Sequence, residues 1–224
     1  YVFPGGAVDA ADGSAAALAA CNEGEASLAA RIGRVTQVGD QALAYAVAAL
    51  RECFEECGLW LGAPDDHVPA DGWAAARARL HAGTRLAALA ADMGLPLATS
   101  CLQPFARWVT PAGLPKRFDT LFVVARAPAG QVPSVDAGET TTLAWVQPAA
   151  ALAARQQGQF QMEFATVSVV KDLVPFGSAA ALLAHAAAQT SLPPVHPRVT
   201  FGDDGKVSGV LLPGQAGYEA AWAG

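Results

Sequence analysis

Residues 45–61, YAVAALRECFEECGLWL, form the stretch that most limits how this chain can fold. From two residues before this stretch, apolar side chains recur in steps of four, three and four residues, at Leu43, Val47, Leu50 and Phe54. In a helix this spacing places them in one stripe that faces a core, and Gly58 then ends the pattern. We therefore predict a buried amphipathic helix over residues 41–57, with Asp40 as its N-cap.

The charged side chains of this helix are predicted to lie opposite the apolar stripe. They are Arg51, Glu52, Glu55 and Glu56. Carboxylates three or four residues apart repel by roughly a few tenths of a kcal/mol per pair, and acids in a last helical turn oppose the helix dipole by roughly 0.3–1 kcal/mol each. Arg51 can pair with Glu55 one turn later, but one arginine cannot neutralise three acids. Two interpretations are open: a solvated acidic face, or hard oxygen ligands for Mg²⁺ or Mn²⁺.

Composition weakens the first interpretation and limits the class of protein. Charged residues make up only 15% of the 224 residues, so four of them within residues 51–56 are a local concentration. The net charge of −6, with scattered Lys and Arg, argues against nucleic acid as a partner. No apolar run reaches the roughly 18–20 residues of a membrane span, and no signal-peptide pattern is present. The four cysteines lack two pairs with metal-ligand spacing, which predicts reduced thiols in a cytoplasmic protein.

The rest of the chain is predicted to contain both strands and helices. Strands are expected within 1–9 and over 103–110, 117–127 and 140–146. Helices are expected over 72–81, 84–93, 147–157, 162–174 and 178–188, and a hairpin around Asp203-Asp204-Gly205 near the end. Residues 13–39 show little periodicity beyond a short helix near 14–20. We predict that they form an insertion or a mobile loop, which can be shortened at a cost of roughly a kcal/mol or less.

Three segments together resemble the Nudix box, G-x5-E-x7-R-E-U-x-E-E-x-G-U, in which U is a bulky apolar residue. They are FPGG at 3–6, Asp12, and RECFEECGL at 51–59. The last segment matches the second half of the box closely. In the first half Asp12 replaces Glu, and 38 residues separate it from Arg51 where the pattern has seven. A box split in this way is similar to the Nudix subgroup that resembles peroxisomal coenzyme A diphosphatases. RWVTPAGLPKRFDTLFVVARAP at 107–128, Glu139 with Trp145, and LLPG near the end extend the resemblance over nearly the whole chain.

The resemblance implies an α/β class and an α/β/α sandwich with a mixed sheet. Residues 1–224 would form a single Nudix domain. Within it, 13–39 would be an insertion inside the box, 68–98 a helical insert and 196–213 a C-terminal hairpin.

The resemblance also implies a set of site residues. The metal ligands would be Glu52, Glu55, Glu56 and the carbonyl of Gly5. The catalytic residues would be Glu52, Glu55, Arg51 and Glu139, with Arg51 orienting the carboxylates and either Glu52 or Glu139 as the general base. The substrate-binding residues would be Gly6, Thr110, Lys116 and Arg117. Arg117 would meet a substrate phosphate, or would instead pair with Asp119 or another acidic residue.

The implied function is hydrolysis of a nucleoside diphosphate linked to a second group, with Mg²⁺ or Mn²⁺ as cofactor. Coenzyme A or acyl-CoA is the substrate that the subgroup suggests; ADP-ribose, NADH and dinucleoside polyphosphates are the alternatives. A second class stays open, a catalytically silent Nudix-fold module that binds a nucleotide. The expected partner is a small diphosphate substrate, without nucleic acid or membrane, and a homodimer is compatible with the sequence.

Overall fold

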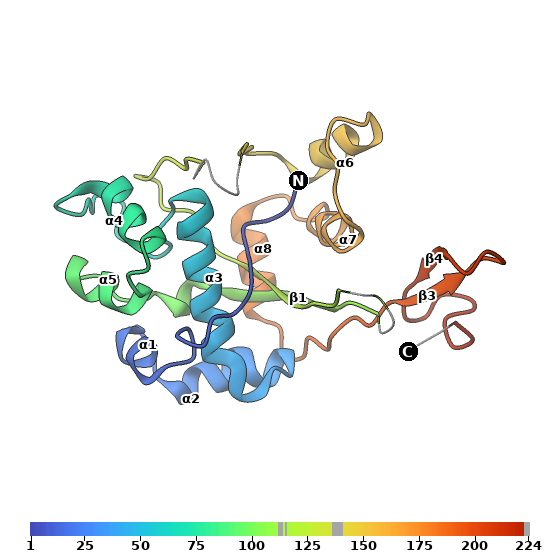
Figure 1. Cartoon of the computed structure of the whole chain (residues 1–224), viewed down its shortest axis with the longest axis horizontal. Coiled ribbons are helices and arrows are strands. Elements are labelled where there is room, and N and C mark those ends of the chain that lie inside the picture. Colours follow the sequence, from blue (N-terminus) through green and yellow to red (C-terminus); the bar gives the residue numbers. More distant parts are fainter. Residues whose placement is uncertain (112–113, 115, 136–140, 222–224) are drawn as a thin grey trace.

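The computed structural model describes residues 1–111, 114, 116–135 and 141–221. Its main helices are α1 (Ala15–Ala20), α2 (Glu25–Leu28), α3 (Ala42–Cys57), α4 (Gly72–His81), α5 (Leu86–Met93), α6 (Pro148–Gln156), α7 (Phe164–Leu173) and α8 (Ala179–Ala187) (Figure 1). Shorter turns are the π-helix η1 (Ala29–Arg34) and the 3₁₀ helices η2 (Gly39–Gln41) and η3 (Thr99–Cys101). The strands are β1 (Gln103–Val109), β2 (Asp119–Val124), β3 (Arg198–Phe201) and β4 (Val207–Leu211).

Helix α3 has the predicted apolar stripe and lies in the main core. Val47, Leu50 and Phe54 are buried, and Leu43 packs against the same cluster while partly exposed. Gly58 ends the helix in the left-handed conformation at φ 71°, and its N–H bonds to the carbonyl of Phe54. The predicted N-cap is wrong. The chain enters α3 through η2, which contains Asp40, and the N-cap position falls on Gln41 without a side-chain bond.

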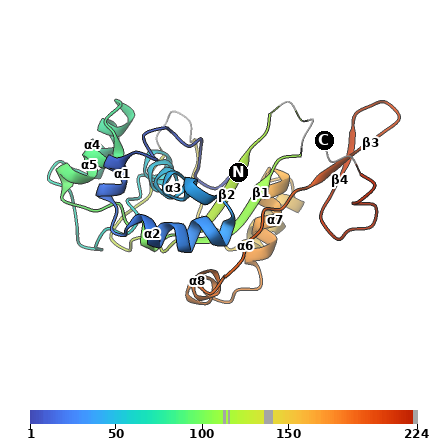
Figure 2. The ribbon, with the colours of Figure 1, turned by 90° about the horizontal axis from the view of Figure 1, so that it is seen from below.

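The pair β1–β2 lies between two helical layers. Leu121 and Val123 of β2 pack against the cluster that contains α3, whereas Ala106 and Trp108 of β1 pack with Val169 of α7. Along the long axis of the molecule, Figures 1 and 2 show α4, α5 and α1 at one end, this strand pair in the middle and β3–β4 at the other end. The expected α/β class with helices on both sides of the strands is thus observed, but the expected mixed sheet is not seen among the described residues.

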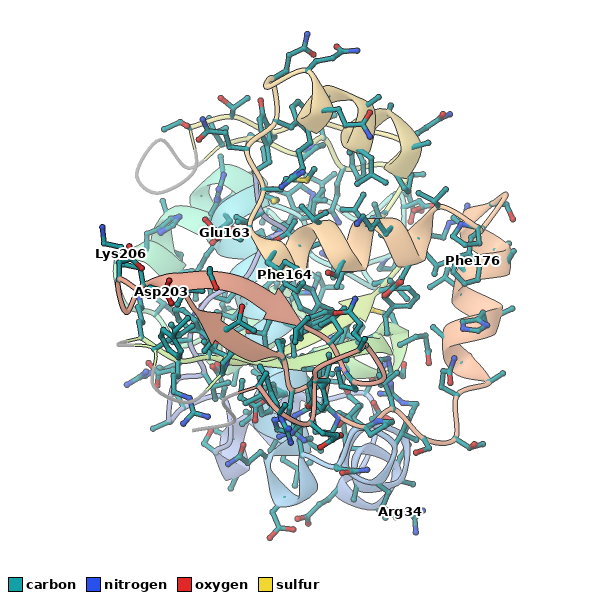
Figure 3. All side chains as sticks on the ribbon, turned by 90° about the vertical axis from the view of Figure 1, so that its right-hand side faces the viewer. Arg34, Glu163, Phe164, Phe176, Asp203 and Lys206 are labelled. Atoms are coloured by element: carbon teal, nitrogen blue, oxygen red, sulfur yellow. The ribbon has the colours of Figure 1, made fainter. Side chains whose placement is uncertain are left out.

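Strand pairing within both sheets is antiparallel. β1 pairs with β2, with an irregularity between Pro104 and Ala106, and β3 pairs with β4. Parallel pairing occurs, among the described residues, at two isolated bridges, Cys21 with Leu97 and Trp108 with Val195. The predicted hairpin at 196–213 is present, and Figure 3 shows Asp203 and Lys206 at its turn.

Two predicted strands are wrong. Residues 1–9 and 141–146 have no strand, and Thr140 lies outside the described residues. A strand needs a neighbouring strand to bond with, which an apolar run cannot reveal. In the second segment Trp145 and Val146 are instead exposed, at 75% and 44% of their surface.

The prediction of a mobile loop at 13–39 is also wrong. α1 and the continuous helical turns of α2 and η1 occupy most of it, and Leu28 and Ile32 are 1% and 0% exposed in the main core. Leu28, Ile32 and Thr36 are spaced by four residues, a stripe that surrounding alanines conceal in the sequence. At Gly33 an added Cβ would lie 2.8 Å from the carbonyl oxygen of Gly39, so small residues allow the close packing. This segment is part of the fold.

The remaining predicted helices agree with the structure. Those expected over 72–81 and 84–93 correspond to α4 and α5, and the last three correspond to α6, α7 and α8. The four cysteines are thiols and form no disulfide with one another. No helix in the described ranges combines the length and apolar character needed to cross a membrane.

Candidate functional site

Arg51 is the centre of a charged cluster on α3. Its Nη1 donates to Oε1 of Glu52 at 2.8 Å and to Oε2 of Glu55 at 2.7 Å. Its Nη2 donates to the carbonyl of Ala7 at 2.8 Å and to Oδ2 of Asp12 at 2.9 Å. The predicted pair between Arg51 and Glu55 is therefore confirmed. We call Asp12, Arg51, Glu52 and Glu55 the Arg51 cluster.

Asp12 joins the two halves of the motif in space. It is 2% exposed, its carboxylate accepts from Nε and Nη2 of Arg51, and Oδ2 also accepts the N–H of Asp9 at 2.8 Å. The intervening helices α1 and α2 pack on the core and return the chain to α3. A motif that is split by 38 residues in the sequence is thus continuous in the structure.

The two glycines of FPGG lie against the glutamates of α3. The N–H of Gly5 donates to Oε2 of Glu56 at 3.4 Å. A Cβ on Gly6 would lie 2.5 Å from Oε1 of Glu52, closer than real contacts allow. Because Arg51 holds that oxygen, Glu52 cannot turn aside without losing a bond. The backbone can therefore approach this carboxylate only where it lacks a side chain.

Burial and pairing change the ionisation of two members of the cluster. Burial raises the pKa of Glu52, and the charge of Arg51 opposes this rise only in part. Burial alone would lower the pKa of Arg51, but its hydrogen bonds and attraction to Asp12 and Glu52 outweigh burial and raise it. Arg51 therefore stays charged, and the cluster as a whole is negative.

The glutamates of this site provide the type of ligand atom that a hard divalent cation binds. Glu52, Glu55 and Glu56 offer only oxygen, the ligand that Mg²⁺ and Mn²⁺ prefer. Within the described residues, however, no three Asp, Glu, His or Cys side chains converge closely enough to hold an ion. Arg51 holds one oxygen of Glu52 and one of Glu55. Binding an ion would thus require the carboxylates to turn toward a common point.

The other predicted substrate residues lie elsewhere. Thr110, Lys116 and Arg117 flank the end of the β1–β2 hairpin, which points away from α3 in Figures 1 and 2. Nε of Arg117 donates to the carbonyl of Thr110 at 3.2 Å, and Nζ of Lys116 lies 5.0 Å from the centre of the Phe118 ring.

Two further predictions concern Asp119 and Glu139. Asp119, the alternative partner proposed for Arg117, forms a two-bond pair with Arg107 at 2.8 and 2.6 Å. Glu139, the second candidate for the general base, lies outside the described residues.

Sequence reasoning missed Arg77, which contacts the end of α3. Its Nε donates to the backbone carbonyl of Glu55 at 2.7 Å, and its Nη1 donates to the carbonyl of Ser134 at 2.9 Å. The side chain is buried on α4 beside Ala76 and Leu80. A signal was present, because Arg77 shares its helix face with Trp73 and Leu80, where an apolar residue is expected.

No family model matches this chain, and no curated protein matches it. A solved structure does, the crystal structure of a NUDIX hydrolase from Alicyclobacillus acidocaldarius. The two share 28% identity at a TM-score of 0.62, and the match covers 82% of this chain and 79% of the other. The chain therefore has a Nudix fold.

Proposed function

We propose that this protein is a metal-dependent hydrolase that cuts the diphosphate joining a nucleoside to a second group. The observation that carries the proposal is the Arg51 cluster, in which one guanidinium holds Glu52 and Glu55 beside Gly5 and Gly6 on a Nudix fold. A negative cluster of this kind is unfavourable unless a cation compensates it. A role in binding a cation explains why the chain contains it.

Each residue of the site has a task in this proposal. Glu52, Glu55 and Glu56, with the carbonyl of Gly5, would hold Mg²⁺ or Mn²⁺. The bound ion would neutralise the diphosphate and lower the pKa of the attacking water. Arg51 would fix the orientation of the carboxylates, as its bonds to Glu52 and Glu55 indicate.

The general base would be Glu52 or Glu139. Burial raises the pKa of Glu52, which makes its carboxylate a stronger base and so suits this role. The charge of a bound ion would act in the opposite direction on that pKa.

The substrate is the finer part of the proposal. The split box and the segment at 107–128 resemble the subgroup of coenzyme A diphosphatases, which favours coenzyme A or an acyl-CoA. ADP-ribose, NADH and dinucleoside polyphosphates are the competing substrates of the same chemistry. Thr110, Lys116 and Arg117 could meet a phosphate of a long substrate at the hairpin end.

A catalytically silent nucleotide-binding module is the second candidate. It is favoured by one observation, that the carboxylates are tied to Arg51 and no three described acidic, histidine or cysteine side chains converge. Retention of Arg51, Glu52, Glu55 and Glu56 argues for catalysis, since a binding module is free to lose so unfavourable a set.

A hydrolysis assay separates these candidates. Purified protein is incubated with coenzyme A, an acyl-CoA, ADP-ribose, NADH and a dinucleoside polyphosphate, each with Mg²⁺, Mn²⁺ or excess EDTA. We expect metal-dependent release of nucleotide from at least one substrate, and coenzyme A species to be cut best. Preferred cleavage of ADP-ribose would refute the subgroup while keeping the mechanism. Metal binding without turnover of any substrate would support the silent module.

A further inference from the structure

A second polar site lies beside the C-terminal end of α3. It is a pocket of about 420 Å³ between α4 and residues 131–135, within the roughly 300–1,000 Å³ typical of small-molecule pockets. The lining residues that matter here are Trp73, Arg77, His81, Val132, Ser134 and Val135. Gly58, the residue that ends α3, also lines it, so the pocket adjoins the helix end that carries the glutamates.

Arg77 is the unusual member of this lining. It is 7% exposed, and its Nε and Nη1 donate to the carbonyls of Glu55, Ser134 and Val135 and to the Ser134 hydroxyl. Its Nη2 is buried and has no hydrogen-bond partner within the described ranges. The acceptors of Arg77 in these ranges are neutral oxygens. A buried guanidinium donor without an acceptor is unfavourable, and an anionic ligand would supply an acceptor and a charge that complements Arg77.

The neighbours of Arg77 indicate what that ligand carries besides its anion. Trp73 and His81 lie one turn before and one turn after Arg77, and therefore on the same face of α4. His81 is exposed and adds a second nitrogen donor. Trp73 is held by Trp60, whose ring it stacks on at 6.4 Å between centroids, and gives the pocket a rigid aromatic wall. The pocket thus offers nitrogen donors from two residues and an aromatic surface.

We infer that this pocket binds the nucleoside monophosphate part of a nucleotide, with its phosphate at Arg77 and His81 and its base against Trp73. Base stacking on aromatic rings and phosphate binding by arginine are the matching interactions. The choice of a nucleotide rests on the proposed function. The link to the Arg51 cluster is direct, because Arg77 bonds to the carbonyl of Glu55, whose side chain bonds to Arg51. A nucleotide seated here would place its diphosphate toward the end of α3.

The test is calorimetric titration of the full chain with AMP in excess EDTA. Inorganic phosphate and adenosine serve as partial ligands. Val132, at 87% exposure, allows a charge to be placed in the lining with little structural cost. We expect AMP to bind one site and to bind more tightly than either partial ligand. Val132→Glu should weaken AMP binding by about tenfold or more through repulsion of the phosphate, and His81→Ala by about threefold or more.

The matched control is Val207→Glu, which adds the same charge to β4, outside the pocket. It should leave AMP binding unchanged. Wild-type protein that does not bind AMP, or equal affinities in Val132→Glu and wild type, would overturn the inference. EDTA removes any metal-dependent hydrolysis from this assay, so its failure would leave the proposed hydrolase standing. Conversely, if the protein hydrolyses none of the substrates and still binds AMP in this pocket, the inference stands and the proposed activity is refuted.

Discussion

Nη2 of Arg51 donates to Oδ2 of Asp12 at 2.9 Å, across 39 positions of the sequence. Asp12 stands where the Nudix pattern has a glutamate, and its shorter side chain still reaches the guanidinium because α1 and α2 bring its loop onto α3. The bond makes the N-terminal segment and α3 parts of one site. The contribution of this bond to stability can be measured separately from catalysis.

Asp12→Asn should lower the free energy of unfolding by about 1–3 kcal/mol, because it leaves the charge of Arg51 with one ion-pair partner fewer in a buried place. Urea unfolding measures this change. Asp203→Asn, in the exposed turn of the β3–β4 hairpin, is the control and should change stability by less than about 0.5 kcal/mol. Equal stability of Asp12→Asn and wild type would show that the bond does not stabilise the fold.

Gly6→Ala should disturb the orientation of Glu52, since the added Cβ would lie 2.5 Å from Oε1. We expect kcat to fall by about tenfold or more with a smaller change in KM, as for loss of an interaction at the reacting centre. Gly24→Ala is the matched control, because a Cβ there meets nothing within 4 Å. Normal turnover in Gly6→Ala would mean that this carboxylate is free to move without loss.

Leu28→Ala tests whether residues 13–39 belong to the fold. Leu28 is 1% exposed in the main core, so its truncation should cost about 2–5 kcal/mol of unfolding free energy. Ala29→Ser, one exposed position further on, should cost less than about 0.5 kcal/mol. A loss below about 1 kcal/mol for Leu28→Ala would restore the interpretation of a mobile insertion.

Stability should also depend on pH through Glu23. Burial alone would raise its pKa, but the hydrogen bonds from Arg31 and Ser27 outweigh it and hold the pKa below the ordinary 4.5. A carboxylate whose pKa is lower in the folded than in the unfolded protein stabilises the fold at pH values above the unfolded pKa. This contribution is lost as the pH falls through the pKa of the folded protein. The difference in unfolding free energy between wild type and Glu23→Gln should therefore shrink below about pH 4.5. A difference that is constant from pH 7 to pH 3 would contradict this role.

The sequence predicted those parts of the molecule that depend on local pattern. The stripe of α3, its end at Gly58 and the pair between Arg51 and Glu55 follow from helical spacing and from the properties of glycine. The approach of Asp12 to Arg51 agrees with the motif, although 38 residues intervene.

Other parts were not predictable in this way. The strands expected within 1–9 and over 140–146 are absent from the described residues 1–9 and 141–146, because an apolar run does not reveal whether a neighbouring strand is present. The core role of Leu28 and Ile32 was hidden because alanine weakens the contrast between the two faces of a helix. Arg77 stands where the helix pattern expects an apolar residue, but its acceptors could not be predicted, because Glu55 and Ser134 are 22 and 57 positions away in the chain.

The central claim is that the glutamates of α3 support metal-dependent hydrolysis, and the most direct test compares wild type with Glu55→Gln. Wild-type protein should release nucleotide from at least one diphosphate substrate with Mg²⁺ or Mn²⁺, lose that activity in excess EDTA and regain it when metal is restored. Glu55→Gln should lower kcat by about a hundredfold or more while stability changes by less than about 1 kcal/mol, because relief of repulsion among the glutamates offsets the weakened pair with Arg51. Full activity in EDTA, or normal turnover in Glu55→Gln with a large loss of stability, would contradict the account.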